Sequence, residues 1–533
     1  MSEPVRVRIA GADVDDIVQP LVEAEVASGI AAQDPALWGP AAEADAENRL
    51  GWVAASEVSR PLVAEIEALR AELRDEGIDR VVLCGMGGSS LAPEVITRTA
   101  GADLVLLDST EPTVVAHALE ADLGRTVVVV SSKSGSTLET DSQRRAFLAA
   151  FASAGVDGAS RMVAVTDPGS ELAKLGESEG YRRVFLADPS VGGRYSALTA
   201  FGLVPSGLAG ADIGALLDQA ESLRSRLAQD SADNPALVLG AVLGGFPGRD
   251  KVIIVDAGSG ITGFGAWVEQ LLAESTGKEG TGVLPVPVEG LDAPDFTAAA
   301  PDEVRVVLEG AASAAGLDAS VPTAGVAGSL GEQLLLWETA TAVAGRLLGI
   351  NPFDQPDVES AKEAARGLLD EQPQPSPAAF TDGVVEVRGT DGLLAGVDDV
   401  AGAVDSLLDQ LPERGYVAVM AYVNAERDAT LSGVRAALAA RTGRPVTFGW
   451  GPRFLHSTGQ YHKGGSPVGV FVQITTAAPE DMPIPDRPFS FGELIAAQAA
   501  GDAEVLAEHG RPVLRLHLTD VEAGVRQLTE VLR

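Results

Sequence analysis

The sequence predicts an α/β protein with two parallel-sheet domains, flanking helices and a C-terminal extension of one strand and one helix. Three observations support this prediction. Short apolar runs, each about the length of a buried strand, alternate with helical segments over residues 80–188. A second series of the same kind begins with KVIIVDAG at 251–258. At 533 residues, the chain is also too long for one hydrophobic core.

The N-terminal half follows this pattern in order. Residues 1–49 predict a strand and a helical lead-in, and residues 56–76 predict a helix because apolar side chains recur near helical spacing. Five buried strands are then predicted from the runs VVLCG, LVLLD, TVVVV, MVAVT and RVFLA. A polar helical connector at 209–232 separates this sheet from the second series.

The second series runs through VLPVPV and VRVVLEG to a helix at 330–348. A Pro-rich linker at 371–380 interrupts it, and GVVEVRG predicts an extended segment after the linker. YVAVMAY, a helix at 427–441 and VTFGWG predict a further strand-helix-strand unit, and PVLRLHL with a helix at 520–532 closes the chain. The predicted ranges are an N-terminal lead-in (1–79), a first α/β domain (80–208), a helical connector (209–250), a second α/β domain (251–370), a linker and hairpin (371–415), a continuation of the second domain (416–475) and a C-terminal extension (476–533).

The composition excludes several classes of partner. Lys and Arg number 39 against 76 Asp and Glu, which gives a formal charge of −37 and argues against nucleic-acid or anionic-membrane binding. The single cysteine, Cys84, ends an apolar run and is expected to be a small core residue. With no recognisable signal peptide and no long apolar run free of Gly and Pro, we expect a soluble cytoplasmic protein.

Two loops point to a phosphorylated small molecule. Each follows a predicted strand and opens a helix, GMGGSS at 85–90 and SSKSGSTLET at 131–140, so backbone N–H groups and hydroxyls would meet a phosphate there. Neither loop is a P-loop, and the first departs from GxGxxG at Ser90, so a nucleotide is the weaker alternative. One such loop alone could be an ordinary turn, but two in one sheet favour a site. The candidate ligands are Gly88, Ser89, Ser132, Lys133, Ser134 and Thr137.

Two further segments carry charged candidates. Arg194 follows paired glycines in SVGGRYS, and an arginine keeps its charge at any working pH. Glu274 opens ESTGK, although a lone glutamate is usually a solvated surface residue. Lysine occurs only six times, and four of the six lie in Gly-rich or motif-like segments: Lys133, Lys278, Lys362 and Lys463.

Taken together, these motifs resemble the phosphoglucose isomerase family, whose members are built of two sugar-isomerase domains. GMGGSS, SKSGSTLET, SVGGRYS, ESTGK and NPFDQPDVESAK occur in order over about residues 80–365. The last one, at 351–362, matches the family's FDQxxVExxK element. The resemblance implies an aldose–ketose isomerase that interconverts glucose 6-phosphate and fructose 6-phosphate through a cis-enediol, without a metal, nucleotide or other cofactor.

The resemblance also implies a role for each matched residue. Glu274 resembles the general base that moves a proton between C2 and C1, and Arg194 resembles the cation that stabilises the enediolate. Lys362 resembles the lysine near the ring oxygen that assists ring opening. Ser89, Ser132, Ser134 and Thr137 resemble the phosphate ligands, and Glu139 has a supporting role at the end of the second loop. This chemistry needs a carboxylate within reach of a carbon-bound proton and a fixed cation where negative charge develops.

One feature departs from the family pattern. The ring-opening histidine normally precedes the FDQ element, but no histidine lies between Glu274 and Asn351. His456, within FLHSTGQY, resembles the LHSxGQ segment of bacterial members and follows the FDQ element instead. This order looks most like the isomerase part of bifunctional transaldolase/phosphoglucose isomerase proteins. His462 and Lys463 are secondary substrate-contact candidates, whereas His117 and His509 are expected at the surface.

Some alternatives remain open at this point. The site would also suit a broader isomerase that accepts mannose 6-phosphate, or a non-catalytic phosphosugar-binding regulator that keeps the hydroxyl loops. In the family the ring-opening histidine comes from a neighbouring subunit, which implies a homodimer. The displaced position of His456 predicts that it acts within its own chain, in which case a monomer suffices.

Overall fold

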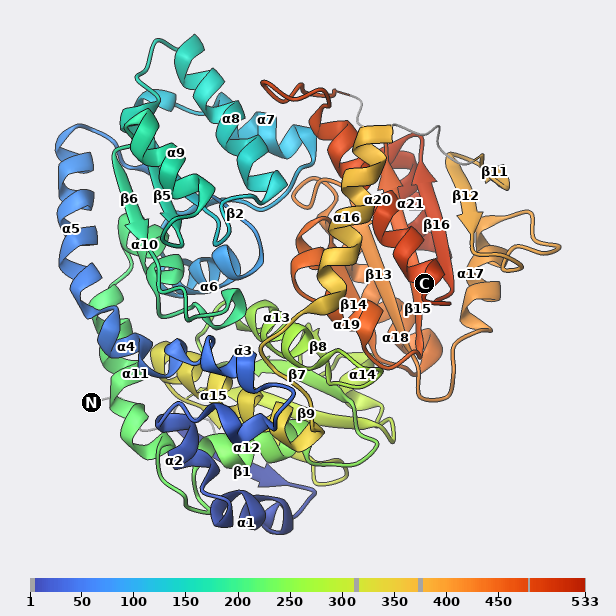
Figure 1. Ribbon diagram of the computed structural model, residues 1–533. Helices are drawn as coiled ribbons and strands as arrows, with labels where there is room; N and C mark the ends of the chain where they lie inside the picture. Colours follow the sequence, from blue (N-terminus) through green and yellow to red (C-terminus); the bar gives the residue numbers. More distant parts are fainter. Residues whose placement is uncertain (1–4, 311–315, 372–376, 478–479, 533) are drawn as a thin grey trace.

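Three α/β units, each built around one sheet, make up the computed structural model, which describes residues 5–310, 316–371, 377–477 and 480–532. Side chains at 358–362 and 370–371 also lie outside the described part. We call the units first, second and third in chain order. Figure 1 shows the first unit at the upper left, the second below it and the third to the right.

The first unit contains the five parallel strands that the sequence predicts. Their order across the sheet is β3 (Val105–Leu107), β2 (Arg80–Gly85), β4 (Thr126–Ser131), β5 (Met162–Thr166) and β6 (Arg183–Leu186). Helices cover both faces, so the central strands are buried throughout, as parallel strands require. One face is covered by α5 (Arg60–Asp75), α6 (Leu91–Ala100) and α10 (Ala200–Ala209), the other by α7 (Pro112–Glu120), α8 (Leu138–Ser153) and α9 (Glu171–Glu179).

The second unit has the same strand order, except that the N-terminal strand occupies one edge. The order is β8 (Leu284–Val288), β7 (Lys251–Ala257), β9 (Glu303–Glu309), β10 (Thr323–Ala327) and β1 (Arg6–Ala10). The first four are parallel, whereas the N-terminal strand β1 pairs antiparallel with β10. Helices of this unit and its connector are α11 (Ile213–Leu227), α12 (Pro235–Gly244), α13 (Phe264–Thr276), α14 (Pro294–Thr297) and α15 (Leu330–Leu348).

Helix α15 has the bounds that the sequence predicts, for identifiable reasons. A capping box between Ser329 and Glu332 starts it, and Gly349 ends it in the left-handed conformation with a φ of 71°. The helix predicted at 56–76 is instead two helices, α4 (Ala55–Val58) and α5, because Pro61 favours a new helix start there. The other N-terminal helices are α1 (Asp15–Glu23), α2 (Val26–Ala31) and α3 (Glu43–Glu47).

The third unit differs from the prediction for residues 416–475. Its strands form a separate six-stranded sheet and do not extend the sheet of residues 251–370. The order is β11 (Phe380–Asp382), β12 (Val385–Gly389), β16 (Val513–Leu518), β15 (Gly469–Thr476), β13 (Tyr416–Tyr422) and β14 (Val446–Trp450). Helices α17 (Val400–Leu408), α18 (Val434–Thr442) and α21 (Val521–Val531) cover one face.

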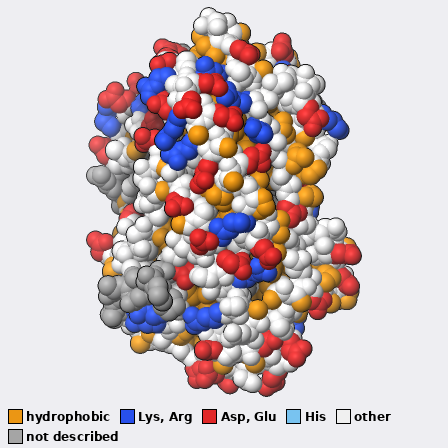
Figure 2. Space-filling model, turned by 90° about the vertical axis from the view of Figure 1, so that its left-hand side faces the viewer, with side chains coloured by type: hydrophobic (Ala, Val, Ile, Leu, Met, Phe, Trp, Pro, Cys, Tyr) orange, Lys and Arg blue, Asp and Glu red, His pale blue; other side chains and the backbone are white. Residues whose placement is uncertain are grey.

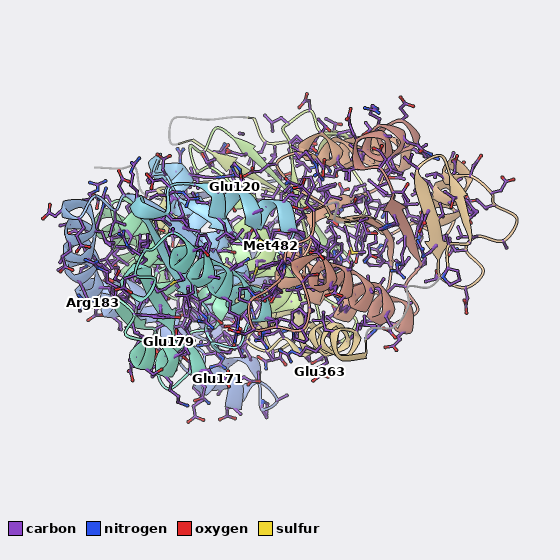
Figure 3. The ribbon with its side chains drawn as sticks, turned by 90° about the horizontal axis from the view of Figure 1, so that it is seen from above. Glu120, Glu171, Glu179, Arg183, Glu363 and Met482 are labelled. Atoms are coloured by element: carbon purple, nitrogen blue, oxygen red, sulfur yellow. The ribbon has the colours of Figure 1, made fainter. Side chains whose placement is uncertain are left out.

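Apolar contacts join the third unit to the other two. Tyr416, Met420 and Phe471 share a core with Ile253 and Val286 of the second sheet. Helices α16 (Pro356–Glu371) and α20 (Phe491–Glu508) pack together and contact the first unit through a second core. Figure 3 shows Met482 between the first unit and the α16 region that carries Glu363. A short helix, α19 (Gly459–Gly464), lies between α13 and α16.

The chain has a formal charge of −37, but the face shown in Figure 2 has no single acidic patch. On the face shown in Figure 2, Asp and Glu side chains are interspersed with Lys and Arg side chains. Among the described residues, no helix combines the length and apolarity needed to cross a membrane.

Candidate active site

The glycine loop after β2 contacts the turn that carries Arg194. A Cβ atom at Gly88 would lie 2.0 Å from the carbonyl oxygen of Gly193 and 3.0 Å from the backbone nitrogen of Arg194. Only glycine fits at that distance. The paired glycines of both motifs therefore bring residues about one hundred positions apart into direct backbone contact.

The same loop contacts the second and third units. Gly87 has a φ of +55°, and a Cβ atom there would lie 2.7 Å from Nε2 of Gln270 and 3.0 Å from both Cβ and the carbonyl oxygen of His456. Gln270 belongs to α13, and His456 ends a short 3₁₀ helix, η8 (Arg453–His456), after β14. All three units therefore meet at this loop.

Glu274 lies in the last turn of α13, close to Arg194. Nη1 of Arg194 is 4.0 Å from Oε2 of Glu274, and Nε2 of Gln270 donates to the same carboxylate oxygen at 3.3 Å. Glu274 is 8% exposed and Arg194 is 3% exposed. The sequence alone leaves Glu274 as an unremarkable glutamate, but the structure makes it a buried carboxylate beside a buried cation.

The guanidinium of Arg194 is held by neighbours from two other segments. Nε donates to Oγ of Ser275 at 2.8 Å, and Nη1 donates to Oε1 of Gln355 at 2.7 Å. Nη2 donates to the carbonyl oxygens of Pro352 at 2.7 Å and Asp354 at 3.0 Å. The bonds to the FDQ element fix the orientation of the Arg194 guanidinium. A charge fixed in advance in this way is what stabilisation of a developing negative charge requires.

Lys278 fastens the FDQ element to the end of α13. Its Nζ donates to the carbonyl oxygen of Asn351 at 2.7 Å and to both the carbonyl oxygen and Oδ1 of Asp354 at 2.6 Å. Burial lowers the pKa of Lys278 to about 8, against the attraction of Asp354. The lysine of ESTGK is therefore a structural clamp for the segment that orients Arg194.

His456 lies against a carboxylate of the first unit. Its Nε2 is 2.9 Å from Oε1 of Glu139 at the start of α8, and its carbonyl oxygen accepts a bond from Nε2 of Gln270 at 2.7 Å. Nε2 of Gln498, on α20, donates to the same Glu139 oxygen at 2.8 Å. The predicted residues Glu139 and His456, 317 positions apart, thus form a pair within one chain.

The segment that carries His456 is anchored on both sides. Arg453 forms ion pairs with Glu94 on α6 and with Asp108 after β3, the latter at 2.9 Å. Oγ of Ser457 donates to Oε1 of Glu269 at 3.3 Å. Burial raises the pKa of Glu269 to about 7, although Ser457 and Arg453 act in the opposite direction. The position of His456 therefore depends on both the first unit and α13.

The second predicted loop leads from β4 into α8, and its hydroxyls bond to one another. Oγ of Ser132 is 2.9 Å from Oγ1 of Thr137 and accepts a bond from the backbone N–H of Gly135 at 3.1 Å. Oγ of Ser134 is 3.0 Å from Oγ of Ser136. A ligand can exchange these neutral contacts for stronger charge-assisted ones. Lys133 instead pairs with Asp167 at 2.6 Å.

The remaining predicted residues divide into three groups. Ser89 is half-buried in the glycine loop, beside the Gly88–Gly193 contact. Lys362 falls within α16, but its side chain lies outside the described part of the chain. His117 and His509 are exposed, as predicted.

His462 and Lys463 are not positioned as substrate contacts. His462 is 2% exposed inside the third unit, where its Nδ1 is 3.0 Å from the hydroxyl of Tyr416, and burial lowers its pKa to about 3. Lys463, also 2% exposed, donates to Oδ1 of Asp502 at 2.5 Å. Their position next to the segment that carries His456 predicted contact with the substrate. The structure differs, because the turn of α19 directs both side chains into the core.

Two residues of the site carry no motif of their own. Gln270 and Gln498 each orient a predicted residue, His456 and Glu139 respectively, yet glutamine is a common surface side chain. The one usable signal is the spacing of Gln270, four residues before Glu274, which places both on one face of a helix.

Comparisons with known proteins show which family the chain is similar to. The model of the family described as phosphoglucose isomerase matches residues 69–283, a stretch that contains Arg194 and Glu274 and ends before the FDQ element and His456. A protein of Natronomonas pharaonis named probable glucose-6-phosphate isomerase is 33% identical over 339 residues, which is 55% of this chain and 79% of that protein. The glucose-6-phosphate isomerase of Synechococcus elongatus is 29% identical over 356 residues, 55% of this chain and 66% of the relative.

Two solved structures share the fold. A hypothetical protein from Thermus thermophilus superposes with a TM-score of 0.57 at 24% identity, over 68% of this chain and all of that one. The crystal structure of a glucose-6-phosphate isomerase from Chlamydia trachomatis has a TM-score of 0.53 at 19% identity, over 68% of this chain and 85% of that one. The likeness therefore covers about two thirds of the chain.

Proposed function

The chain belongs to the phosphoglucose isomerase family, and we propose that it interconverts glucose 6-phosphate and fructose 6-phosphate through a cis-enediol. Such a reaction belongs to glycolysis and gluconeogenesis, and we propose the cytoplasm as its location. The domains at 80–208 and 251–370 are proposed to be the two sugar-isomerase domains. The main support for this proposal is the pair of buried residues Glu274 and Arg194 at the loop where all three units meet. Nη1 of Arg194 lies 4.0 Å from Oε2 of Glu274.

The phosphate is proposed to bind at the loop between β4 and α8. Oγ of Ser132 and Oγ1 of Thr137 bond to each other without a ligand charge, so both are available to a phosphate dianion. The N-terminus of α8 adds backbone N–H groups and a favourable dipole. Ser134, Ser89 and the Gly88 backbone are assigned to the same ligand on the basis of the family resemblance.

Glu274 is proposed to carry the proton. Its carboxylate removes the proton from C2 of the open-chain aldose, which gives an enediolate with its negative charge on the C1 oxygen. The proton of the C2 hydroxyl then moves to the C1 oxygen, so that the negative charge lies on the C2 oxygen. The same carboxyl group then returns a proton to C1 and forms the ketose. Its near-complete burial limits hydration of the carboxylate, and the bond from Gln270 holds the carboxylate in place.

Arg194 is proposed to stabilise the enediolate oxygens. Its guanidinium is held by four hydrogen bonds and cannot swing away, so its charge is present before negative charge develops on the substrate. A fixed cation of this kind lowers the barrier without having to reorganise during the reaction.

Ring opening is proposed to use His456 with Glu139. The Glu139 carboxylate accepts from Gln498 and faces Nε2 of His456 at 2.9 Å, which orients the imidazole for proton transfer to and from the sugar ring oxygen or the C1 hydroxyl. Lys362 is assigned to the ring oxygen by its match to the FDQxxVExxK element alone.

We further propose that one chain supplies the complete site. His456 reaches Glu139 within its own chain, which agrees with the rearranged motif order, and we infer that within the family the chain is most like the isomerase part of bifunctional transaldolase/phosphoglucose isomerase proteins. On this proposal a monomer is competent, and any dimerisation is not needed to complete the site.

The experiment is an isomerase assay with purified protein. Fructose 6-phosphate is supplied with EDTA, and formation of glucose 6-phosphate is followed. We expect turnover in the presence of the chelator, because the proposed base, acid and cation are all protein groups. Run in D₂O, the reaction should place deuterium at C2 of the aldose, since a proton held on Glu274 can exchange with solvent. Absence of an aldose product would overturn the proposal, and activity that returns only when Mg²⁺ or Zn²⁺ is added would contradict the proposed roles.

A further inference from the structure

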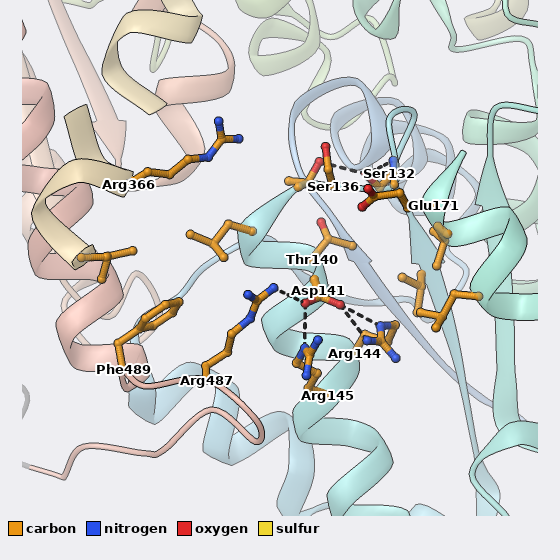
Figure 4. Close-up of a pocket in the computed structure, with 17 residues that line it drawn as sticks. Ser132, Ser136, Thr140, Asp141, Arg144, Arg145, Glu171, Arg366, Arg487 and Phe489 are labelled. Carbon is orange, nitrogen blue, oxygen red and sulfur yellow. Dashed lines mark hydrogen bonds and ion pairs between the residues drawn. The ribbon is translucent and has the colours of Figure 1, made fainter. Parts of the chain in front are cut away.

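A cavity of about 690 Å³ borders the phosphate loop, and its lining goes beyond what a sugar monophosphate needs. Ser132, Gly135, Ser136 and Thr137 line it, and Figure 4 shows Ser132 and Ser136 among the lining residues. Its volume is typical of small-molecule sites. The described lining of the cavity contains none of the proposed catalytic residues Glu274, Arg194 and His456. The cavity therefore extends away from these residues.

Four arginines line the same cavity. Arg144 and Arg145 come from α8, which the phosphate loop opens, whereas Arg366 comes from α16 and Arg487 from the segment before α20. Figure 4 shows Arg366 extending from α16 toward the loop and Arg487, below it on the same side of the view, extending to Asp141. The later part of the chain thus supplies positive charge to a site of the first unit.

Asp141 forms ion pairs with three of these arginines, but its single negative charge neutralises only one positive charge. Nη2 of Arg144 lies 2.7 Å, Nε of Arg145 2.7 Å and Nη2 of Arg487 2.8 Å from its carboxylate oxygens. Burial would raise the pKa of Asp141, but the bonds from the arginines prevail and lower it to about 2. The carboxylate therefore stays ionised and holds the three guanidinium groups near one another.

The fourth arginine, Arg366, is available to a ligand. Arg366 is exposed, and among the described residues it has no ion pair or hydrogen bond. Glu171 is the only other acidic group in the described lining, but two carboxylates outside the lining also lie near the arginines: Glu179 is 3.7 Å from Arg144, and Asp486 is 3.5 Å from Arg145. Arg366 therefore presents a positive charge that no described carboxylate pairs with, in a chain whose formal charge is −37. Lys133, the nearest lysine in sequence, is already paired with Asp167.

We propose that this cavity binds a ligand with two or more linked phosphate groups, which competes with the sugar phosphate. One phosphate occupies the loop hydroxyls, and the next phosphates accept bonds from Arg366 and Arg487. The planar guanidinium fork suits this geometry, because it donates two parallel bonds to a phosphate. The inference rests on the proposed function in one respect, the assignment of the loop to the substrate phosphate.

Binding of two inorganic probes tests the proposal. The dissociation constants of inorganic phosphate and tripolyphosphate are measured by calorimetry at fixed ionic strength, together with their inhibition constants against fructose 6-phosphate. In the wild-type protein we expect tripolyphosphate to bind at least about tenfold more tightly than phosphate, because charge-assisted bonds to arginine are added. Inhibition should be competitive for both probes.

Two variants and a control locate the added affinity. Arg366→Gln and Arg487→Gln should each weaken tripolyphosphate about tenfold and leave phosphate nearly unchanged. Arg487→Gln leaves Asp141 with two arginines, and Arg366 has no described partner to lose, so both variants should fold. Arg526→Gln removes the same charge from α21, where Arg526 pairs only with Glu522 in the described structure, and should change neither constant. Ser132→Ala should weaken both probes.

The outcomes separate this inference from the proposed function. Equal affinity for the two probes in the wild-type protein, or tripolyphosphate binding that neither arginine variant weakens, would overturn the polyphosphate site. Loss of affinity in Arg526→Gln equal to that in the cavity variants would overturn it as well, because it would show a general charge effect. If the arginine variants behave as expected but the protein does not isomerise fructose 6-phosphate, the anion site stands and the proposed enzymatic function fails.

Discussion

The first and second units share one strand order but differ in the loops at the ends of their strands. In both, the second strand of the series lies at the edge and the first strand lies beside it, followed by the third and fourth. After β7 of the second unit, the backbone N–H groups of Gly258 and Ser259 both donate to Oδ1 of Asp256, at 3.0 and 2.7 Å. In the first unit, by contrast, the loop hydroxyls bond mainly to one another.

This difference between the loops explains why two units with the same strand order are expected to differ in anion binding. In the second unit, the carboxylate of Asp256 already accepts bonds from the backbone N–H groups of the loop. These groups are therefore not available to an anion, which the negative charge of Asp256 would also repel. The second unit contributes the end of α13 instead, where Glu274 and Ser275 meet Arg194. Ligand recognition therefore follows the loops and not the topology, as expected of widely used folds.

The largest expected effect comes from the second unit. Glu274→Gln keeps the shape of the side chain and removes the proton acceptor, so kcat should fall by about 10²–10⁴ while inorganic phosphate still binds. The control, Glu177→Gln on the exposed side of α9, should leave kcat unchanged. Turnover above about a tenth of wild type in Glu274→Gln would show that another group is the base.

The next effect tests the contribution of the third unit. His456→Ala should lower kcat by about 10², the lower end for a single acid–base group, and should impair cyclic substrate more than the open-chain form, because the enediol step belongs to Glu274. Rapid-mixing measurements on cyclic and freshly generated open-chain sugar phosphate make the comparison. Equal impairment of both forms would place His456 in the enediol step instead.

A smaller effect compares the two loops directly. Ser132→Ala and Thr137→Ala should each raise KM and the dissociation constant of phosphate about tenfold, since a bond to a charged phosphate contributes about 1.5–3 kcal/mol. Ser259→Ala changes the corresponding loop of the second unit and should leave both values unchanged. If the Ser259 variant raised KM and the first-unit variants did not, the roles of the two loops would be reversed.

The smallest effect concerns the contribution of one buried glutamate to stability. Glu338 on α15 is fully buried, neither carboxylate oxygen has a hydrogen-bond partner among the described residues, and burial raises its pKa well above 4.5. The unfolded chain ionises this group above about pH 4.5 while the folded protein keeps it protonated, so its presence lowers stability as the pH rises.

Glu338→Gln should therefore stabilise the protein more at pH 8 than at pH 5.5, by roughly 1–3 kcal/mol at the higher pH, the scale for a buried polar group without a partner. Thermal unfolding at the two pH values measures the difference, with the exposed Glu177→Gln as a control. A gain that is the same at both pH values would mean that Glu338 does not titrate in this range.

The sequence predicts the strands better than the sheets they form. All five strands of the first sheet were predictable, because buried parallel strands appear as continuous apolar runs. The third sheet was not, since an apolar run does not specify its pairing partners: β13 pairs with β14 and also with β15, a strand at 469–476 that is not among the predicted ones. The edge position of β1 likewise depends on contacts more than three hundred residues apart.

The site follows the same division. Glu274, Arg194, Glu139 and His456 stand in recognisable motifs, and the structure brings them to one glycine loop. Gln270 could not be selected from the sequence, because its role exists only through its contact with the carbonyl oxygen of His456, 186 residues later. His462 was misjudged for a related reason: the helical turn after His456 directs its side chain into the core.

The most direct test asks whether one chain holds the whole site. A Glu274→Gln chain and a His456→Ala chain, each with a different affinity tag, are co-expressed, and any mixed assembly is purified through both tags. We expect activity no higher than that of the better single variant, because each chain lacks a group that it must supply itself; active wild-type monomers without assembly would agree equally well. Recovery of activity in proportion to the mixed assemblies would contradict a site within one chain, since the base and His456 would then come from different chains.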